Sequence, residues 1–296
     1  MSDQNHRRGF DGVIRAVGPF VAMAAMGGMM AARHAMSDGQ LADKFDAKLE
    51  RKFGAKFGRR FGPGPGSGGK FRFNGREGVP LDQLDMAADA PSTVVLASGD
   101  HVVIESGADF AIALQGDDQA KADVRFALED GALFIMRDSG GKGHDHATIT
   151  LTMPAPDKLT IAGSGQITTT ALADDAEVAI AGSGRIAANG ITVQQLELSI
   201  AGSGQFTADG TCTHLKLTVA GSGNAQMADL LVDSAKVSIA GSGNVTFASD
   251  GKVKAHLMGS GMVTVRGSAR CKVQSVGSGC LVCEPRTAAD AAAAAE

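Results

Sequence analysis

The tripeptide Gly-Ser-Gly occurs seven times in the second half of this 296-residue chain, at an almost constant interval. Successive first glycines are 19, 20, 19, 20, 18 and 18 residues apart. A period of this length indicates a repeat architecture in which each unit stacks on its neighbours. We predict that the structural turns are formed by Gly163 and Gly165, Gly182 and Gly184, Gly202 and Gly204, Gly221 and Gly223, Gly241 and Gly243, Gly259 and Gly261, and Gly277 and Gly279.

Apolar and polar residues alternate on both sides of each Gly-Ser-Gly. In the first repeat the apolar residues are Leu159, Ile161 and Ile167. Nearly all of the remaining repeats also have apolar residues at these offsets from the first glycine. Such alternation is typical of a strand with one buried face. Each repeat is therefore predicted to be a strand, a tight turn and a second strand. Glycine suits the turn because a sharp reversal needs positive φ or a close contact that a Cβ would obstruct.

A second turn signal lies half a period later, at Gly190, Gly210 and Gly267 and at Asp250-Gly251. Two turns in each period make one complete coil. With coils about 4.8 Å apart, seven of them form a column roughly 30 Å long. Crossovers between parallel strands are right-handed. We therefore predict an all-β fold, a right-handed β-solenoid with about seven Gly-Ser-Gly coils.

Stacked coils place equivalent residues in columns. The serines of the tripeptides would form one column along an edge of the solenoid. Beside it, Gln166, Arg185, Gln205, Asn224 and Asn244 would form a second column that ends in Met262 and Cys280. Stacked Asn and Gln side chains can hydrogen-bond from coil to coil.

Residues 92–157 contain six short apolar segments separated by turn signals such as Ser98-Gly99-Asp100. These segments are predicted to be strands. We expect them to form irregular coils that close one end of the solenoid, since an open end would expose unpaired backbone groups.

The N-terminal part of the chain differs in composition from the rest. Residues 1–75 carry a net charge of +7 and residues 76–296 a net charge of −11. An acidic main body makes binding to nucleic acid improbable. The chain has no Trp and no Tyr, which excludes catalytic Tyr chemistry and Trp or Tyr platforms that stack on sugars or bases.

Residues 1–36 are predicted to be a signal peptide or membrane anchor. Arginines precede an uncharged run of 17 residues, 16–32, as in export signals. The alternative is a helix that packs on the protein itself. Residues 37–61 have a phenylalanine stripe between Lys and Arg, which predicts a basic amphipathic helix on anionic lipid, or alternatively a stalk or solvated linker helix. Residues 62–91 begin with a Gly/Pro-rich stretch and are predicted to be a linker.

No group of residues converges on a recognisable chemistry. The Gly-Ser-Gly turns lack the following helix and the Lys of a phosphate-binding loop. Cys280 and Cys283 have the spacing of metal and redox sites, but in a strand their sulfurs point to opposite faces. Cys212, Cys271 and Cys283 are expected to be buried small residues, with a disulfide near the C-terminal end as the alternative. His144-Asp145-His146 is expected to be a solvated loop. We predict no catalytic residue, metal or cofactor.

The chain combines the predicted short strands, the Met153-Pro154 step and the segment 159–165, which is repeated six more times. In these features it resembles the GIN-domain family, described as putative heads of auto-transporter adhesins. The resemblance covers about residues 92–285 within a predicted domain of residues 92–286, which an Ala-rich tail, 287–296, follows. It implies a β-helix-like superhelix with Gly-Ser-Gly at turns between sheets. It also implies an envelope or surface location and an adhesion role without known catalytic residues.

We therefore expect a non-enzymatic protein of the cell envelope that binds an unknown protein or glycan ligand through a rigid, repetitive β surface, and membrane lipid through its N-terminal segment. Two alternatives remain open. One is a membrane-associated scaffold, a homo-oligomer whose coils stack end to end. The other is a carbohydrate-active β-helix enzyme.

Overall fold

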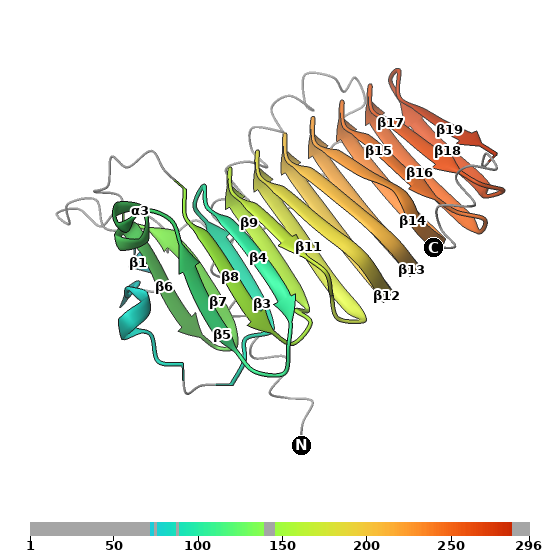
Figure 1. The fold of residues 1–296 in the computed structure, drawn as a ribbon. Coiled ribbons are helices and arrows are strands. Elements are labelled where there is room, and N and C mark those ends of the chain that lie inside the picture. The colour runs from blue at the N-terminus through green and yellow to red at the C-terminus, as the bar shows by residue number, and fades with distance from the viewer. Residues whose placement is uncertain (1–71, 74–75, 87–88, 139–145, 286–296) are drawn as a thin grey trace.

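The computed structural model describes residues 72–73, 76–86, 89–138 and 146–285 (Figure 1). The predicted signal or anchor, the predicted amphipathic helix and the C-terminal tail lie outside these residues. Within the described part, no helix combines the length and the apolar character that crossing a lipid bilayer requires.

A β-solenoid of about seven turns makes up the body of the molecule, as predicted (Figure 1). Consecutive strands pair in parallel with the coil above and the coil below. The solenoid strands are β9 (Lys158–Gly163), β10 (Gln166–Thr169), β11 (Asp175–Gly182), β12 (Arg185–Gly202), β13 (Gln205–Gly221), β14 (Asn224–Gly241), β15 (Asn244–Ala248), β16 (Lys252–Gly259), β17 (Met262–Arg266), β18 (Arg270–Val276) and β19 (Cys280–Glu284).

The Gly-Ser-Gly corners lie directly above one another. In all seven the first glycine has positive φ, between +112° and +137°. The second glycine faces the neighbouring coil, and a Cβ on Gly184 would lie 2.5 Å from Cγ2 of Ile161 and 2.9 Å from the carbonyl oxygen of Gly165. Backbone hydrogen bonds join successive corners; for example, Ser203 N donates to Gly182 O at 2.9 Å. Glycine is therefore needed at both positions, for two different reasons.

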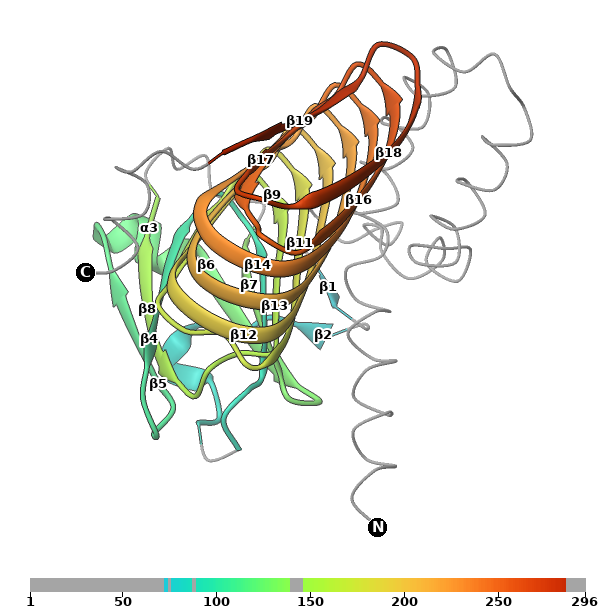
Figure 2. The same cartoon turned by 90° about the vertical axis from the view of Figure 1, so that its right-hand side faces the viewer.

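The second corner is a bend rather than a tight turn in three coils. Strands β12, β13 and β14 continue through it with a β-bulge, and Figure 2 shows their ribbons curving round together. Gly190 and Gly210 lie in this bend with φ of +64° and +115°. A bulge bends a strand while its hydrogen-bonded ladder resumes on the far side. The prediction of a separate turn was therefore wrong for these coils, although the glycines do mark the change of direction.

The core is a stack of apolar columns, as the alternation predicted. Leu159, Val178, Leu198, Leu217 and Val237 follow one another in register, and each is 0% exposed. On the other side of the corner, Ile167, Ile186, Phe206, Ala225, Val245 and Val263 form a second buried column. Burying like residues on like in every coil stabilises the repeat, because no coil could bury its apolar face alone.

At the N-terminal end, the order of the coils in space differs from their order in the sequence. Strands β3 (Thr93–Ala97) and β4 (His101–Ser106) form a coil around the corner Ser98-Gly99-Asp100. This coil lies between β9 and β10 on one side and β7 (Ala132–Arg137) and β8 (Thr148–Met153) on the other. The expected irregular coils are therefore present, and one of them is inserted between two later segments of the chain.

An antiparallel layer closes this end. Strand β5 (Ala111–Gln115) pairs with β8, and β6 (Val124–Glu129) pairs with β7. The short helix α3 (Asp118–Asp123) connects β5 to β6, and the side chain of its N-cap, Asp117, accepts a hydrogen bond from Ala120 N at 2.6 Å. Antiparallel pairing ends the parallel stack and covers its edge.

The packed region begins earlier than predicted. Strands β1 (Arg72–Phe73) and β2 (Arg76–Glu77) form a hairpin, and the 3₁₀ helix η1 spans Leu81–Gln83. Val79 pairs with Phe126 through two backbone hydrogen bonds of 2.7 and 2.8 Å. Leu81 and Leu84 pack against the core. The segment 79–84 therefore belongs to the folded body and not to the predicted linker, 62–91.

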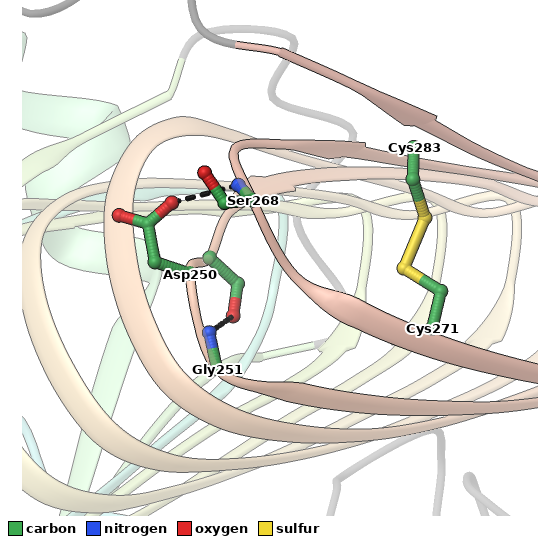
Figure 3. Close-up of a disulfide and its surroundings, with 6 residues drawn as sticks. Asp250, Gly251, Ser268, Cys271 and Cys283 are labelled. Atoms are coloured by element: carbon green, nitrogen blue, oxygen red, sulfur yellow. Dashed lines mark hydrogen bonds between the residues drawn. A yellow bond between two sulfur atoms is a disulfide. The ribbon is translucent and has the colours of Figure 1, made fainter.

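A disulfide crosses the opposite end. Cys271 on β18 and Cys283 on β19 are bonded inside the last coil (Figure 3). Both cysteines have the predicted inward orientation, but Cys271 is only half-buried and Cys283 is exposed. The predicted burial was wrong because no described coil covers this end. Val273 occupies a position that is buried in the other coils and is 47% exposed here.

Candidate functional site

One broad face of the solenoid carries a regular array of polar side chains, most of them uncharged, which we call the amide face. It consists of the outward positions of β10, the first part of β12, and the strands stacked on them. The predicted column is present, because Gln166, Arg185, Gln205, Asn224 and Asn244 pair in register, with Met262 and Cys280 following. The amides lie one coil apart, at about 4.8 Å.

Two hydrogen bonds run along this column. Asn244 Nδ2 donates to Asn224 Oδ1 at 3.3 Å, and Arg185 Nη2 donates to Gln205 Oε1 at 2.6 Å. These bonds fix the side chains of neighbouring coils relative to one another. Each terminal amide or guanidinium still has further donors or acceptors that can serve a ligand.

A second column on the amide face consists mostly of threonines. Thr150, Thr168, Thr207, Thr246 and Thr264 occupy this column, in which Val103, Ala187 and Gln226 also lie. His101 Nε2 lies 3.2 Å from Thr168 Oγ1 and joins the two columns at the N-terminal end. β-branched residues are suited to a pleated surface, and their hydroxyls add donors and acceptors at regular intervals.

The exposed corner borders the amide face. Ser164, Ser183, Ser203, Ser222, Ser242, Ser260 and Ser278 are all exposed, as the predicted serine column requires. The corner is therefore a row of hydroxyls on a rigid backbone, and rigidity of this kind lowers the entropy cost of binding.

A buried ion pair stabilises the corner at the N-terminal end. The carboxylate of Asp100 is fully buried and accepts from Arg137 Nη2 at 2.6 Å, from Ala147 N at 2.8 Å and from Ser98 Oγ at 2.7 Å. Burial alone would raise the pKa of Asp100, but hydrogen bonds from Arg137, Ser98 and Ala147 together hold this pKa below its ordinary value. The pair orders the corner on which Gly163-Ser164-Gly165 stacks. No local sequence pattern reveals this pair, since the two residues are 37 positions apart.

The four cysteines do not form a metal or redox site of the Cys-x-x-Cys type. Cys283 is bonded to Cys271, while Cys280 is an exposed free thiol. Cys212 is buried, as predicted, and burial raises the pKa of its thiol to about 11. The structure therefore contains the disulfide near the C-terminal end that was the alternative to buried thiols at Cys271 and Cys283.

The described residues contain no group of three or more His, Cys, Asp and Glu that could hold a metal ion. Of the segment His144-Asp145-His146, only His146 is described, and its ring packs over Gly99. The amide face offers hydrogen-bond donors and acceptors, which can hold a polar ligand.

The comparisons with known proteins agree with this fold. The family described as "Putative auto-transporter adhesin, head GIN domain" matches residues 90–269. The chain belongs to this family. No curated protein matches it.

Several solved structures share the fold of this GIN-domain protein. One, described as a putative adhesin from Bacteroides fragilis, has 20% identity and a TM-score of 0.60, and the match covers 67% of this chain and 93% of the other. A putative lipid binding protein from Parabacteroides distasonis has 21% identity and a TM-score of 0.53, with 66% and 92% covered. A putative adhesin from Parabacteroides merdae has 15% identity and a TM-score of 0.51, with 68% and 93% covered.

Proposed function

We propose that this GIN-domain protein is a non-enzymatic, adhesin-like binding protein of the cell envelope, and that its amide face binds an uncharged glycan. The observation that carries the proposal is the in-register column of amides, which repeats the same hydrogen-bonding group at a fixed interval. A glycan chain repeats its hydroxyl groups in the same way, so weak contacts at successive coils add to one another.

The family supports the adhesin-like role. Its description is that of a putative adhesin head domain, and two of the solved structures above are described as putative adhesins. The polar character of the face favours a hydroxylated ligand over an apolar protein surface, because apolar and aromatic residues dominate the centre of protein interfaces.

The disulfide supports a location outside the cytoplasm. Structural disulfides form and persist in oxidising compartments and are rare in the cytosol. The charged start and uncharged run of residues 1–36 would direct or anchor the chain there, and the basic segment 37–61 would lie on anionic lipid. Fusing residues 1–75 to alkaline phosphatase, which is active only outside the cytoplasm, tests this part. An inactive fusion that is stably produced would contradict it.

An array of neutral glycans tests the binding role. The double variant Gln205→Ala/Asn224→Ala removes two central amides from the amide face. The matched control Gln194→Ala/Gln195→Ala removes two exposed amides at the far bend. We expect the first variant to lose about tenfold in affinity for the glycans that the unmodified protein retains, and the control to keep its affinity. Failure of the unmodified protein to retain any neutral glycan, or equal losses in both variants, would contradict the proposal.

A further inference from the structure

A column of charged side chains lies on another face of the solenoid, formed by β9, β11 and the strands stacked on them. The sign of its charges changes along the solenoid. In register it contains Lys158, Glu177, Glu197, Lys216, Lys236, Lys254 and Lys272. The first four residues form ion pairs, with Lys158 Nζ 2.9 Å from Glu177 and Lys216 Nζ 2.9 Å from Glu197. The last three are lysines without an intervening acid.

The neighbouring outward column adds two more cations at the same end. Lys252 and Arg270 follow Ser234 in register, two residues before Lys254 and Lys272 on the same strands. We call Lys236, Lys252, Lys254, Arg270 and Lys272 the cationic strip. It runs across β14, β16 and β18, which lie side by side at the C-terminal end (Figure 1).

All five side chains of the cationic strip are exposed, and none forms an ion pair with another described residue. Like charges on directly paired strand positions repel one another and destabilise the sheet. In the earlier coils Glu177 and Glu197 also lie opposite each other, but each of them has a lysine partner on its other side, Lys158 and Lys216. The last three coils keep the repulsion, which an anionic ligand would relieve.

The strip belongs to a wider separation of charge. Residues 76–233 have eight Lys and Arg against 22 Asp and Glu, a net charge of −14, whereas residues 234–285 have six against two, a net charge of +4. An acidic polymer is therefore repelled by most of the body and attracted to its C-terminal coils.

We propose that the cationic strip binds a linear acidic polysaccharide, with the chain lying along the solenoid axis. The cations occupy equivalent positions in successive coils, about 4.8 Å apart along the axis. This regular spacing suits a polymer with regularly spaced carboxylates or sulfates. This surface lies on a different face of the solenoid from the amide face, so the two binding proposals can fail independently.

Other anionic partners fit the strip less well. The outward residues beside it are the polar Ser238, His256 and Gln274. The exposed apolar side chains of β18, Val273 and Val276, are only two, which is too few for the apolar centre of a protein interface or for insertion into a lipid bilayer. The strip has no Phe, Tyr or Trp on which nucleic-acid bases could stack.

The test measures binding of the full chain to fluorescent polygalacturonate, which has one carboxylate per sugar, and to uncharged dextran. The variant Lys254→Gln/Lys272→Gln removes two charges from the strip. The control Lys121→Gln/Lys158→Gln removes two ion-paired charges elsewhere, so both proteins have the same net charge. All three proteins contain residues 1–75, so binding by that basic segment contributes equally to each of them. It therefore cannot cause a difference between the strip variant and the control.

We expect the unmodified protein and the control to bind polygalacturonate and not dextran, with affinity falling between about 0.05 M and about 0.5 M salt. We expect the strip variant to bind about tenfold more weakly, equivalent to about 1.4 kcal/mol. Equal affinities in variant and control, or no binding to polygalacturonate, would overturn the proposal. So would tighter, strip-dependent binding to phosphatidylglycerol vesicles or single-stranded DNA, or salt-sensitive self-association lost in the strip variant.

Discussion

At each Gly-Ser-Gly corner, neighbouring residues have very different structural demands. Gly221 has a φ of +119°, and a Cβ there would lie 2.6 Å from the carbonyl oxygen of Gly202. The side chain of Ser222, one residue later, is exposed. The backbone at the corner therefore depends on glycine, whereas the serine hydroxyl is available to solvent or ligand.

Replacing Gly221 tests this difference directly. Gly221→Ala forces a Cβ against a neighbouring backbone at positive φ, and we expect a loss of about 1–3 kcal/mol in the free energy of unfolding. Ser222→Ala is the matched control and should change this free energy by less than about 0.5 kcal/mol. Urea denaturation followed by circular dichroism measures both. Similar values for the two variants would contradict the assigned role of the glycine.

Removing Arg137 tests the buried ion pair. Arg137→Ala leaves the carboxylate of Asp100 without its cation, and we expect a loss of about 3 kcal/mol at pH 7. Because the pKa of Asp100 is lowered in the folded state, its ionisation stabilises the protein above the unfolded pKa of about 3.9.

This contribution is lost as the pH falls through the folded pKa of Asp100. The difference in stability between the unmodified protein and Arg137→Ala should therefore be largest near neutrality and should shrink below about pH 4. Urea titrations at several pH values measure it. A difference that stays constant over this range would show that the loss comes from packing rather than from charge.

The two free cysteines should differ in reactivity. Burial raises the pKa of Cys212 to about 11, and Cys280 is exposed. Because the thiolate is the reactive form, iodoacetamide at about pH 8 should modify Cys280 and leave Cys212 unmodified in the folded protein. Mass spectrometry of the digested protein shows which thiol has reacted, and denaturation in urea should make both react.

At the scale of single elements, each coil is stabilised by the coils on either side. The inner coils have two neighbours, whereas β18 and β19 each pair with one strand. The disulfide between Cys271 and Cys283 joins these two strands where the packing is weakest (Figure 3). It also closes a short loop, with a sequence separation of 12 residues.

Removing this disulfide should loosen the last coil. Closing a loop of this length contributes about 2–3 kcal/mol. We expect Cys271→Ala/Cys283→Ala to increase hydrogen exchange in β18 and β19 and to leave exchange in β12 and β13 unchanged. Cys280→Ala, in the same coil, is the control and should leave the last coil protected. Equal protection of this coil in both variants would contradict the role of the disulfide.

The whole molecule is asymmetric along its axis. The N-terminal end is closed by β5, β6 and α3, whereas the C-terminal end exposes Val273 and is held by the disulfide. Net charge changes sign along the same axis, from acidic coils to basic ones. The two ends therefore differ both in how far they are covered and in the sign of their net charge.

Hydrogen exchange along the chain should follow this asymmetry. The stability of a stacked array is the sum of a contribution from each coil and a contribution from each contact between neighbouring coils. Local unfolding should therefore begin at the C-terminal end, where the last coil has a neighbour on one side. We expect protection of backbone amides to be highest in β12, β13 and β14 and to decrease toward β18 and β19. Exchange at one uniform rate from β9 to β19 would indicate that the solenoid opens as a single unit instead.

Much of the fold followed from the sequence because each coil repeats the same local pattern. The period of the glycines fixed the length of a coil, and the alternation around them fixed which side chains point inward, as Leu198 and Phe206 show. The amide column followed as well, since stacking equal units brings equal positions together. These properties depend on neighbours in sequence and on the repeat, and both can be read without coordinates.

Tertiary structure decided what depends on residues far apart in the sequence. The insertion of β3 and β4 between later strands, the pairing of Asp100 with Arg137 and the bond between Cys271 and Cys283 belong to this group. The loss of alternating charge in the cationic strip became visible only when the register placed Lys236, Lys254 and Lys272 on adjacent strands. A local pattern specifies the conformation of each segment, but the order in which segments stack depends on the free energy of all their contacts together.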